Sequence, residues 1–192
     1  MNPFISEELQ ARLVLASASP RRRELLSRLR FKIPFDASDF VENNVADDPI
    51  QAACANALGK ARDVALRHPG KIVLGADTVV ILDGRILGKP RDEADAARML
   101  TELSGREHEV VTALALVGEG EDVEHGCTRV QFRELSTAEI EAYVASGEPM
   151  DKAGAYGIQG LAGQFVTRID GCYFNVMGLP VELLTRMLKS CR

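Results

Sequence analysis

The feature of this sequence that most limits its fold is a regular alternation between short apolar runs and segments that begin with helix-start signals. The run 71–76 is apolar after its first lysine, as is typical of a strand covered on both faces. The sequence predicts strands at residues 13–16, 71–76, 78–82, 85–87, 110–117 and 128–132, and a strand pair around 170–171. Helices are expected to begin near residues 19, 48, 92 or 95, 136 and 180. This alternation favours an α/β domain with a mixed sheet.

Length and composition favour one folded unit. The chain has 192 residues, which is enough for a continuous core, and its 46% hydrophobic and 27% charged residues argue against disorder. We find no internal repeat, low-complexity tract or linker. We therefore expect a single domain over residues 1–192, in which residues 1–11 form an N-terminal extension, a short tail with no clear role.

Charge and cysteine content exclude several classes of protein. The net charge of −5 disfavours a nucleic-acid binder, which needs a broad basic surface. The four cysteines form no Cys-x-x-Cys pair, so reduced thiols are expected at Cys54, Cys127, Cys172 and Cys191. No apolar run reaches the roughly 20 residues that span a bilayer. The apolar stretch 13–18 is too short for a signal peptide, and it is preceded by glutamates rather than basic residues. We expect a cytoplasmic protein without a membrane partner.

The segment 17–22 is the first candidate for a binding site. Ser19 suits the N-cap of a helix and Pro20 its first position. Arg21 and Arg22 would then lie in the first turn, where the helix dipole disfavours cations unless an anion is present. A phosphate would interact favourably with both the dipole and the guanidinium groups. A solvated helix start with surface arginines is the alternative, and the residues alone leave both interpretations open.

Single polar residues next to predicted strands are weaker candidates. Asp77 follows the most apolar strand, where open α/β sheets place their sites, and it could hold a divalent cation or orient a water molecule. A turn aspartate bonded to its own backbone is the alternative. Lys89, held by the following proline, and Lys60, on an alanine-faced helix, could present cations to phosphates or could simply be solvated. Nothing in the sequence pattern distinguishes Glu42 from an ordinary acidic loop residue.

The glycine-rich stretch 151–163 is the last candidate. Its spacing is neither that of a P-loop nor that of a dinucleotide fingerprint. Its small residues would let the backbone approach a flat ligand such as a base, whose edge Gln159 could read by donating and accepting. A flexible loop is the alternative. The three histidines show no metal-ligand spacing. The residues therefore indicate a phosphorylated ligand and a divalent cation, but they do not separate a hydrolase from a kinase or a binding protein.

Five motifs give a more specific indication. In chain order they are SASPRRRELL at 17–26, GADT at 75–78, GKP at 88–90, LSG at 103–105 and DKAGAYGIQG at 151–160. Together they resemble the motifs of the Maf-like nucleoside triphosphate pyrophosphatases over nearly the whole chain. The resemblance implies the inosine triphosphatase-like fold, which is an elongated mixed sheet flanked by helices, with two lobes and a central cleft.

The resemblance also implies a reaction, which is hydrolysis between the α- and β-phosphates with a divalent cation, Mg²⁺ or Mn²⁺. The catalytic positions that it implies are Asp77, Glu42, Lys60 and Lys89. The positions implied for substrate binding and specificity are Ser17, Arg21, Arg22, Thr78, Lys152 and Gln159. The metal would be held by Asp77 and Glu42.

The intact motif at 151–160 resembles the branch of the family that prefers dTTP and UTP. The resemblance also implies a homodimer. One alternative is a nucleotide-binding regulator of cell division or septum formation with little turnover. The retained Asp77 and both lysine positions favour catalysis over that alternative. A kinase is the third interpretation, and the missing P-loop counts against it.

Overall fold

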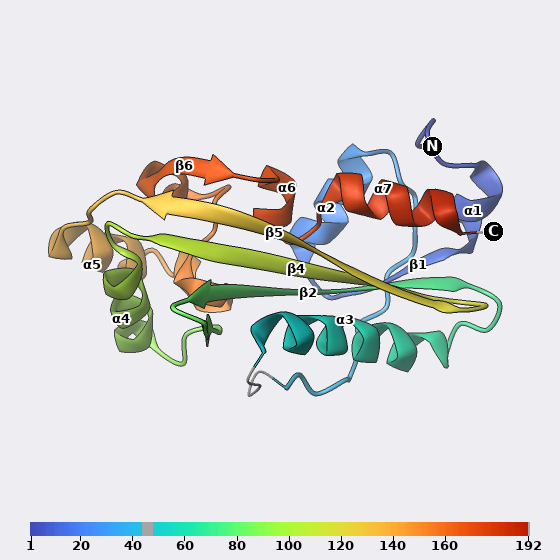
Figure 1. The fold of residues 1–192 in the computed structure, drawn as a ribbon, viewed down its shortest axis with the longest axis horizontal. Coiled ribbons are helices and arrows are strands. Elements are labelled where there is room, and N and C mark those ends of the chain that lie inside the picture. Colours follow the sequence, from blue (N-terminus) through green and yellow to red (C-terminus); the bar gives the residue numbers. More distant parts are fainter. Residues whose placement is uncertain (44–47, 192) are drawn as a thin grey trace.

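The described part of the chain is built on a long mixed sheet. The computed structural model describes residues 1–43 and 48–191. Their sheet has six strands in the order β1-β2-β4-β5-β6, and β3 pairs with β2 beside this path (Figure 1). The strands are β1 (Leu13–Ala16), β2 (Ile72–Leu82), β3 (Arg85–Leu87), β4 (Glu107–Val117), β5 (Glu121–Phe132) and β6 (Val166–Asp170). β1 and β2 are parallel and the other pairs are antiparallel, so the predicted mixed sheet is confirmed.

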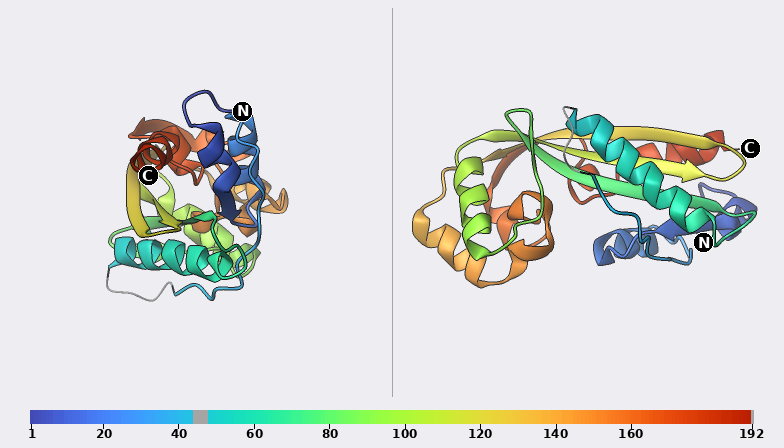
Figure 2. Two further views of the ribbon diagram at one scale, coloured as in Figure 1. Left: turned by 90° about the vertical axis from the view of Figure 1, so that its right-hand side faces the viewer. Right: turned by 90° about the horizontal axis from the view of Figure 1, so that it is seen from below.

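Helices cover both faces of this sheet. They are α1 (Glu7–Arg12), α2 (Pro20–Arg28), α3 (Pro49–Ala65), α4 (Glu93–Leu103), α5 (Thr137–Ala145), α6 (Tyr173–Val176) and α7 (Val181–Ser190), with short 3₁₀ segments η1 (Glu148–Asp151), η2 (Ala153–Ala155) and η3 (Leu161–Phe165). In Figure 2, α3 lies along one face of the sheet. α1, α2 and α7 lie at one end of the molecule, and α4 and α5 at the other. The fold is thus an elongated α/β structure flanked by helices, as predicted.

The helix starts follow the predicted capping signals. Ser19 is the N-cap of α2 with proline at the first position, and Asp92 caps α4 by accepting from the Asp95 amide. The Asp48 side chain caps α3, and Ser136 and Glu139 form a reciprocal capping box at α5. The side chains of Asp48, Asp92 and Ser136 accept from backbone N–H groups that lack a partner inside their helices. No helix in the two described ranges is both long enough and apolar enough to cross a membrane.

The alternating side chains of β2 divide the core into three clusters. Its even-numbered residues up to Ala76 pack with α2 and α7, and those from Val80 onward pack with α4 and α5. Its odd-numbered residues face α3 on the other side of the sheet. Successive side chains of a strand point to opposite faces, so the first two clusters share one face. They form the two predicted lobes, and Thr78 lies at the boundary between them.

One edge of β2 is open at this boundary. β1 pairs with residues 72–75 of β2 and β3 pairs with residues 80–82. Within the described residues, no strand pairs with 76–79 on that side. On the other side β4 pairs with β2 without interruption from Val73 to Ile81. The prediction of two separate strands, with Asp77 beyond the end of the first, is therefore wrong, because pairing with β4 carries the strand through Asp77.

The N-terminal residues are part of the core rather than a tail. Ile5 is 6% exposed and packs in the cluster that contains α2 and α7. The Gln10 side chain is 2% exposed and donates to the carbonyls of Asn2 and Ile5. The Asn2 side chain donates to the Leu29 carbonyl at the end of α2. The expectation of a tail without a role is wrong, because these contacts satisfy buried polar groups and cover apolar surface.

The sheet also differs from the prediction near its end. β5 begins at Glu121 rather than at 128, and its alternation of buried and exposed residues over 128–132 is confirmed. The strand pair predicted around 170–171 is wrong, because β6 is followed by helix α6. The Thr128 hydroxyl bonds both the N–H and the C=O of Cys172. These groups are therefore occupied by a side chain where a second strand would need them.

A buried histidine should make the stability of the fold depend on pH. His108 on β4 is 2% exposed, bonds the Tyr156 hydroxyl at 2.8 Å, and packs against the Phe132 ring. Burial lowers its pKa from 6.5 to about 4. Between these values the unfolded chain binds a proton that the folded chain does not, so the free energy of unfolding falls as pH decreases through this window, by up to about 3 kcal/mol.

Urea unfolding at pH 7 and pH 4.5 checks this prediction. The unaltered chain should lose about 2–3 kcal/mol more stability over this interval than the His108→Gln variant, whose side chain does not titrate. The comparison cancels the contribution of the carboxylates, which both chains share. Equal losses in both chains would contradict the assignment of this pH dependence to His108.

Candidate active site

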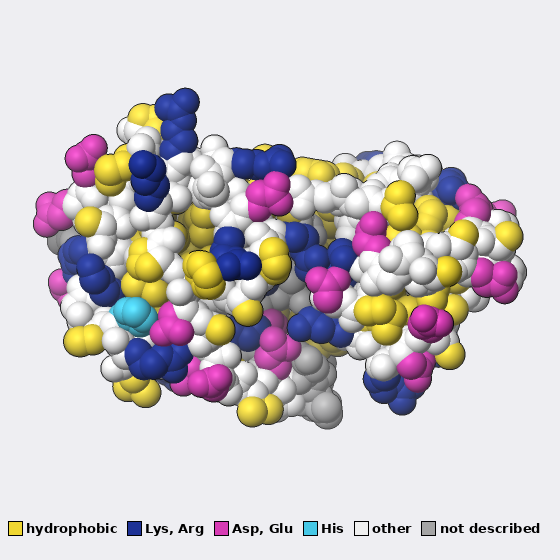
Figure 3. Space-filling view, turned by 180° about the vertical axis from the view of Figure 1, so that it is seen from behind, with side chains coloured by type: hydrophobic (Ala, Val, Ile, Leu, Met, Phe, Trp, Pro, Cys, Tyr) yellow, Lys and Arg dark blue, Asp and Glu magenta, His cyan; other side chains and the backbone are white. Residues whose placement is uncertain are grey.

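A cleft lies between the two lobes at the open edge of β2. Its cavity has a volume of about 910 Å³, which is within the usual range for small-molecule sites. Figure 3 shows this hollow in the middle of one face, with Lys and Arg side chains around it. The structure brings all ten predicted site residues to this cleft, namely Ser17, Arg21, Arg22, Glu42, Lys60, Asp77, Thr78, Lys89, Lys152 and Gln159.

The charge of the cleft differs from that of the whole chain. Its lining has five cationic side chains and four acidic ones, whereas the chain has a net charge of −5. Cationic side chains that converge in a concave site attract anionic ligands even when the protein as a whole is acidic. The cleft is therefore less acidic than the chain as a whole.

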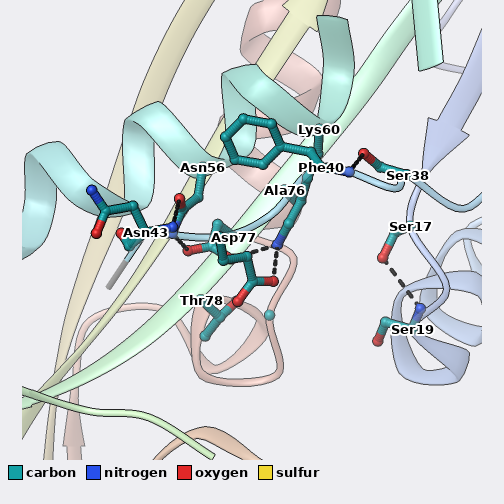
Figure 4. A network of polar contacts seen from close by, with 12 residues as sticks. Ser17, Ser19, Ser38, Phe40, Asn43, Asn56, Lys60, Ala76, Asp77 and Thr78 are labelled. Carbon is teal, nitrogen blue, oxygen red and sulfur yellow. Dashed lines mark hydrogen bonds and ion pairs between the residues drawn. The ribbon is translucent and has the colours of Figure 1, made fainter. Parts of the chain in front are cut away.

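Asp77 lies on the face of β2 that is covered by α3. A Cβ atom on Gly75 would lie 2.1 Å from the Ala57 carbonyl oxygen, so α3 can approach β2 closely only at a glycine. This approach brings Lys60 Nζ to 2.6 Å from Asp77 Oδ1, and Asn56 Nδ2 to 3.3 Å from Oδ2 (Figure 4). The Asp77 residue is only 5% exposed. Its carboxylate is thus held by two donors from one helix.

Glu42 reaches the same lysine from a different segment. Its Oε1 lies 2.6 Å from Lys60 Nζ. The segment before it packs on α3, where Phe40 occupies the space that a side chain on Gly59 would need. The Asp63 carboxylate holds the same segment by accepting from Ser38 Oγ and from the Asp39 amide. A glycine in the middle of an alanine-rich helix was the one sequence signal for this contact.

The two carboxylates form a donor set that suits a hard cation. Glu42 and Asp77 converge on the Lys60 ammonium. Within the described ranges no group of three or more His, Cys, Asp and Glu side chains could hold a metal. Mg²⁺ is commonly bound by one or two carboxylates together with water and substrate phosphates. Oxygen ligands from two carboxylates fit that pattern.

Arg22 is buried beside these groups and is bonded entirely to protein oxygens. Its Nε donates to the Gly178 carbonyl, Nη1 to the Ala76 carbonyl and Ser17 Oγ, and Nη2 to Thr78 Oγ1. Burial lowers its pKa, and the nearby Asp77 charge opposes that shift. The guanidinium thus binds the open edge of β2 to the start of α2 and to the segment before α7. Four of its five N–H hydrogens are used in this way.

This geometry predicts different effects at two adjacent arginines. Arg22→Lys keeps the charge but cannot make four bonds in a fork, so it should lower the free energy of unfolding by about 3 kcal/mol. Arg21→Lys is the matched control. Arg21 is partly exposed and makes one 3.5 Å ion pair with Asp151, so its loss should cost about 0.5 kcal/mol or less. Urea unfolding of both variants measures the difference, and equal losses would contradict it.

The start of α2 leaves hydrogen-bond donors facing the cleft. Ser19 is its N-cap residue but makes no side-chain capping bond, and the first turn holds no acidic residue. Ser17 Oγ accepts from the Ser19 amide and from Arg22. Both lone pairs of this hydroxyl are then used, which leaves its O–H to donate. A helix start with open N–H groups is suited to binding a phosphate.

The opposite wall of the cleft comes from the glycine-rich stretch. Lys152 Nζ donates to the Glu148 carbonyl and to Asp151 Oδ1. The Gly154 amide donates to the Gly88 carbonyl, which ties this stretch to the segment that carries Lys89. Lys89 and Gln159 are exposed at the cleft. The stretch thus forms one wall of the cleft, with the 3₁₀ segment η2 inside it and η1 and η3 at its two ends.

Sequence reasoning missed several polar residues behind the site. Asn56, which bonds Asp77, lies four residues before Lys60 on α3, so helical spacing could have indicated it. Thr78 Oγ1 bonds Thr112 Oγ1, whose hydroxyl donates to the Asn175 carbonyl. No sequence signal pointed to Thr112 or Asn175, because they come from distant segments that meet only in the fold.

The chain is similar to known proteins over most of its length. The family described as Maf-like protein matches residues 12–191. The dTTP/UTP pyrophosphatase of Symbiobacterium thermophilum is 51% identical over 93% of both chains. The enzymes of the same name from Gloeobacter violaceus and Thermococcus gammatolerans are 52% and 51% identical, over 95% and 91% of this chain and 97% and 94% of theirs. The Staphylococcus aureus Ham1 protein, a solved structure, has a TM-score of 0.47 at 15% identity, and it covers 94% of this chain and 99% of its own. This chain belongs to the Maf-like protein family.

Proposed function

We propose that this chain is a nucleoside triphosphate pyrophosphatase that hydrolyses dTTP and UTP to the monophosphate and pyrophosphate. The observation that carries the proposal is the convergence of all ten predicted site residues on one cleft. Relatives with about half of their residues identical are named dTTP/UTP pyrophosphatases. Two buried or half-buried carboxylates beside a group of cations suit hydrolysis of a phosphoanhydride.

In this proposal each wall of the cleft has its own task. The open start of α2, with Ser17 and Arg21, binds phosphate oxygens, and Lys60 and Lys89 stabilise the charge that develops as the bond breaks. Arg22 holds Thr78 and the edge of β2 in place. Asp77, fixed by Asn56 and Lys60, accepts a proton from the water that attacks the α-phosphorus. Lys152 and Gln159 contact the nucleoside end of the substrate.

A divalent cation is part of the proposal. Asp77 and Glu42 are the residues that would hold Mg²⁺ or Mn²⁺. The ion would neutralise charge on the phosphates and favour departure of pyrophosphate. The proposed preference for pyrimidine nucleotides rests on the motif at 151–160 and on the names of the relatives.

Product analysis tests the proposal. The purified chain is incubated with Mg²⁺ or Mn²⁺ and with dTTP, UTP, CTP, GTP, ATP or 7-methylguanosine triphosphate, and pyrophosphate and orthophosphate are assayed separately. Pyrophosphate with monophosphate, strongest for dTTP and UTP, is the expected result. Orthophosphate with diphosphate would contradict cleavage between the α- and β-phosphates. Nucleotide binding without product would favour the regulator instead.

A further inference from the structure

Glu148 lines the cleft but is not one of the ten predicted site residues. It is the first residue of η1 and lines the same cavity as Gln159. Its side chain lies against the turn of residues 157–161, which carries Gln159 at its centre. The contacts of this carboxylate determine how that turn is held.

The Glu148 carboxylate holds both ends of the 157–161 turn, one end directly and the other through the Tyr143 hydroxyl. At one end the Leu161 amide donates to Glu148 Oε2 at 3.1 Å. At the other end the Gly157 amide donates to the Tyr143 hydroxyl at 3.3 Å, and that hydroxyl donates to Glu148 Oε1 at 2.9 Å. The carboxylate therefore receives one donor directly and the other through Tyr143. Gln159 lies midway between the two attachment points.

The turn also packs closely on this carboxylate. A Cβ atom on Gly160 would lie 2.1 Å from Glu148 Oε1, so only a glycine leaves room for it. Tyr143 is buried and its ring packs edge-on against Phe165. Burial, and then its bond to Glu148, raise the Tyr143 pKa, so the hydroxyl stays protonated and keeps donating. Glu148 is itself anchored, because its carbonyl accepts from Lys152 Nζ at 2.6 Å.

We propose that Glu148 and Tyr143 are positioning residues for base recognition, because they fix the turn that presents Gln159 to the pyrimidine base of the substrate. This inference rests on the proposed function. Neither residue needs to touch the substrate for this role. A turn held at both ends restricts Gln159 to few positions, which lowers the entropy lost when a base binds.

The chemistry of the carboxylate makes the role testable by small substitutions. A carboxylate offers acceptors at both oxygens, whereas a glutamine amide has one acceptor oxygen and one donor group. Glu148→Gln can therefore accept from only one of its two donors, at nearly constant size. Tyr143→Phe removes the link to Gly157 alone. Gly160→Ala keeps every polar group but displaces the carboxylate, and the extended φ of −98° at Gly160 accepts an alanine.

Kinetics on UTP and ATP, with hydrogen exchange of residues 157–161, test the proposal on these three variants. Each should raise KM for UTP about tenfold and change kcat about twofold or less, so that the preference for UTP over ATP falls about tenfold. Amides in 157–161 should exchange faster. Glu141→Gln, which removes the same charge from an exposed position on α5, is the control and should behave like the unaltered chain.

The outcomes separate this inference from the proposed function. If the unaltered chain releases pyrophosphate from UTP but the variants keep its UTP preference and its exchange rates, the inference alone is overturned. Equal losses of kcat on both nucleotides, with a lower melting temperature, would assign Glu148 a general structural role and also overturn it. If the unaltered chain releases no pyrophosphate from any nucleotide, the proposed function is lost and this inference with it.

Discussion

The Asp77→Asn variant should lose at least about a thousandfold in kcat/KM while keeping its fold. The change is nearly isosteric, and it removes the negative oxygen that lies 2.6 Å from Lys60 Nζ and is proposed to accept the proton of the attacking water. Lys60 keeps its ion pair with Glu42, so the loss of stability should be about 1 kcal/mol, or roughly 3 °C in the melting temperature. Pyrophosphate release and thermal unfolding measure the two effects.

Asp122→Asn is the matched control for this prediction. Asp122 lies on β5 of the same sheet, outside the cleft, so the same chemical change should leave turnover unaltered. A rate for Asp77→Asn within tenfold of the unaltered chain would remove its catalytic assignment. A variant that melts far below the control would show that Asp77 is needed for folding, and its rate would then be compared at a temperature where it remains folded.

Lys60→Met should weaken both turnover and the fold. The Lys60 side chain is 13% exposed and lies 2.6 Å from each of two carboxylates. Its removal takes away the cation that lies 2.6 Å from both the Glu42 and the Asp77 carboxylates, which should cost about 3 kcal/mol, or roughly 6–12 °C in the melting temperature. Because the ammonium also lies at the proposed phosphate site, kcat/KM should fall about a hundredfold or more.

Divalent cations should partly restore the stability of this variant. Mn²⁺ or Mg²⁺ can take the place of the missing ammonium between the two carboxylates, so each should raise the melting temperature of Lys60→Met more than that of the unaltered chain. The double variant Lys60→Met/Glu42→Gln should lose this extra response, and Lys189→Met on α7 should not acquire it. An equal response in all four chains would place the cation elsewhere and contradict the proposed metal ligands.

Local signals predicted most of the secondary structure. The starts of α3, α4 and α5 follow from capping side chains and that of α2 from Pro20 at its first position, and both signals need only neighbouring backbone. The buried run 72–76 and the alternation over 128–132 likewise follow from local patterns. The features that were predicted wrongly depend on contacts with segments that are distant in the sequence. Pairing with β4 carries β2 through Asp77, Thr128 ends the pairing after β6, and packing against α2 and α7 makes the first residues part of the core.

The residues of the candidate site likewise divide into those that the sequence indicated and those that only the fold brings together. The family resemblance indicated ten residues that line the cleft, but residue patterns alone gave no reason to choose Glu42 and none to notice Glu148 or Asn56. Glu42 contacts Lys60 because Phe40 packs at Gly59. The Glu148 carboxylate accepts from the amide of Leu161, which lies thirteen residues later in the chain. These contacts join residues whose separation in sequence carries no periodic signal.

The sequence by itself determined the α/β class, the helix starts, the chemical types of the site residues and the family. These depend on local backbone preferences, on alternation of apolar residues and on motifs that lie within short segments. Only the tertiary structure decided that, among the described strands, none pairs with residues 76–79 of β2 on the side away from β4, and that Lys60 contacts two carboxylates beside this open edge. The physical reason is that strand pairing and close packing at glycines such as Gly75 are long-range events, and their energies depend on which distant segments meet.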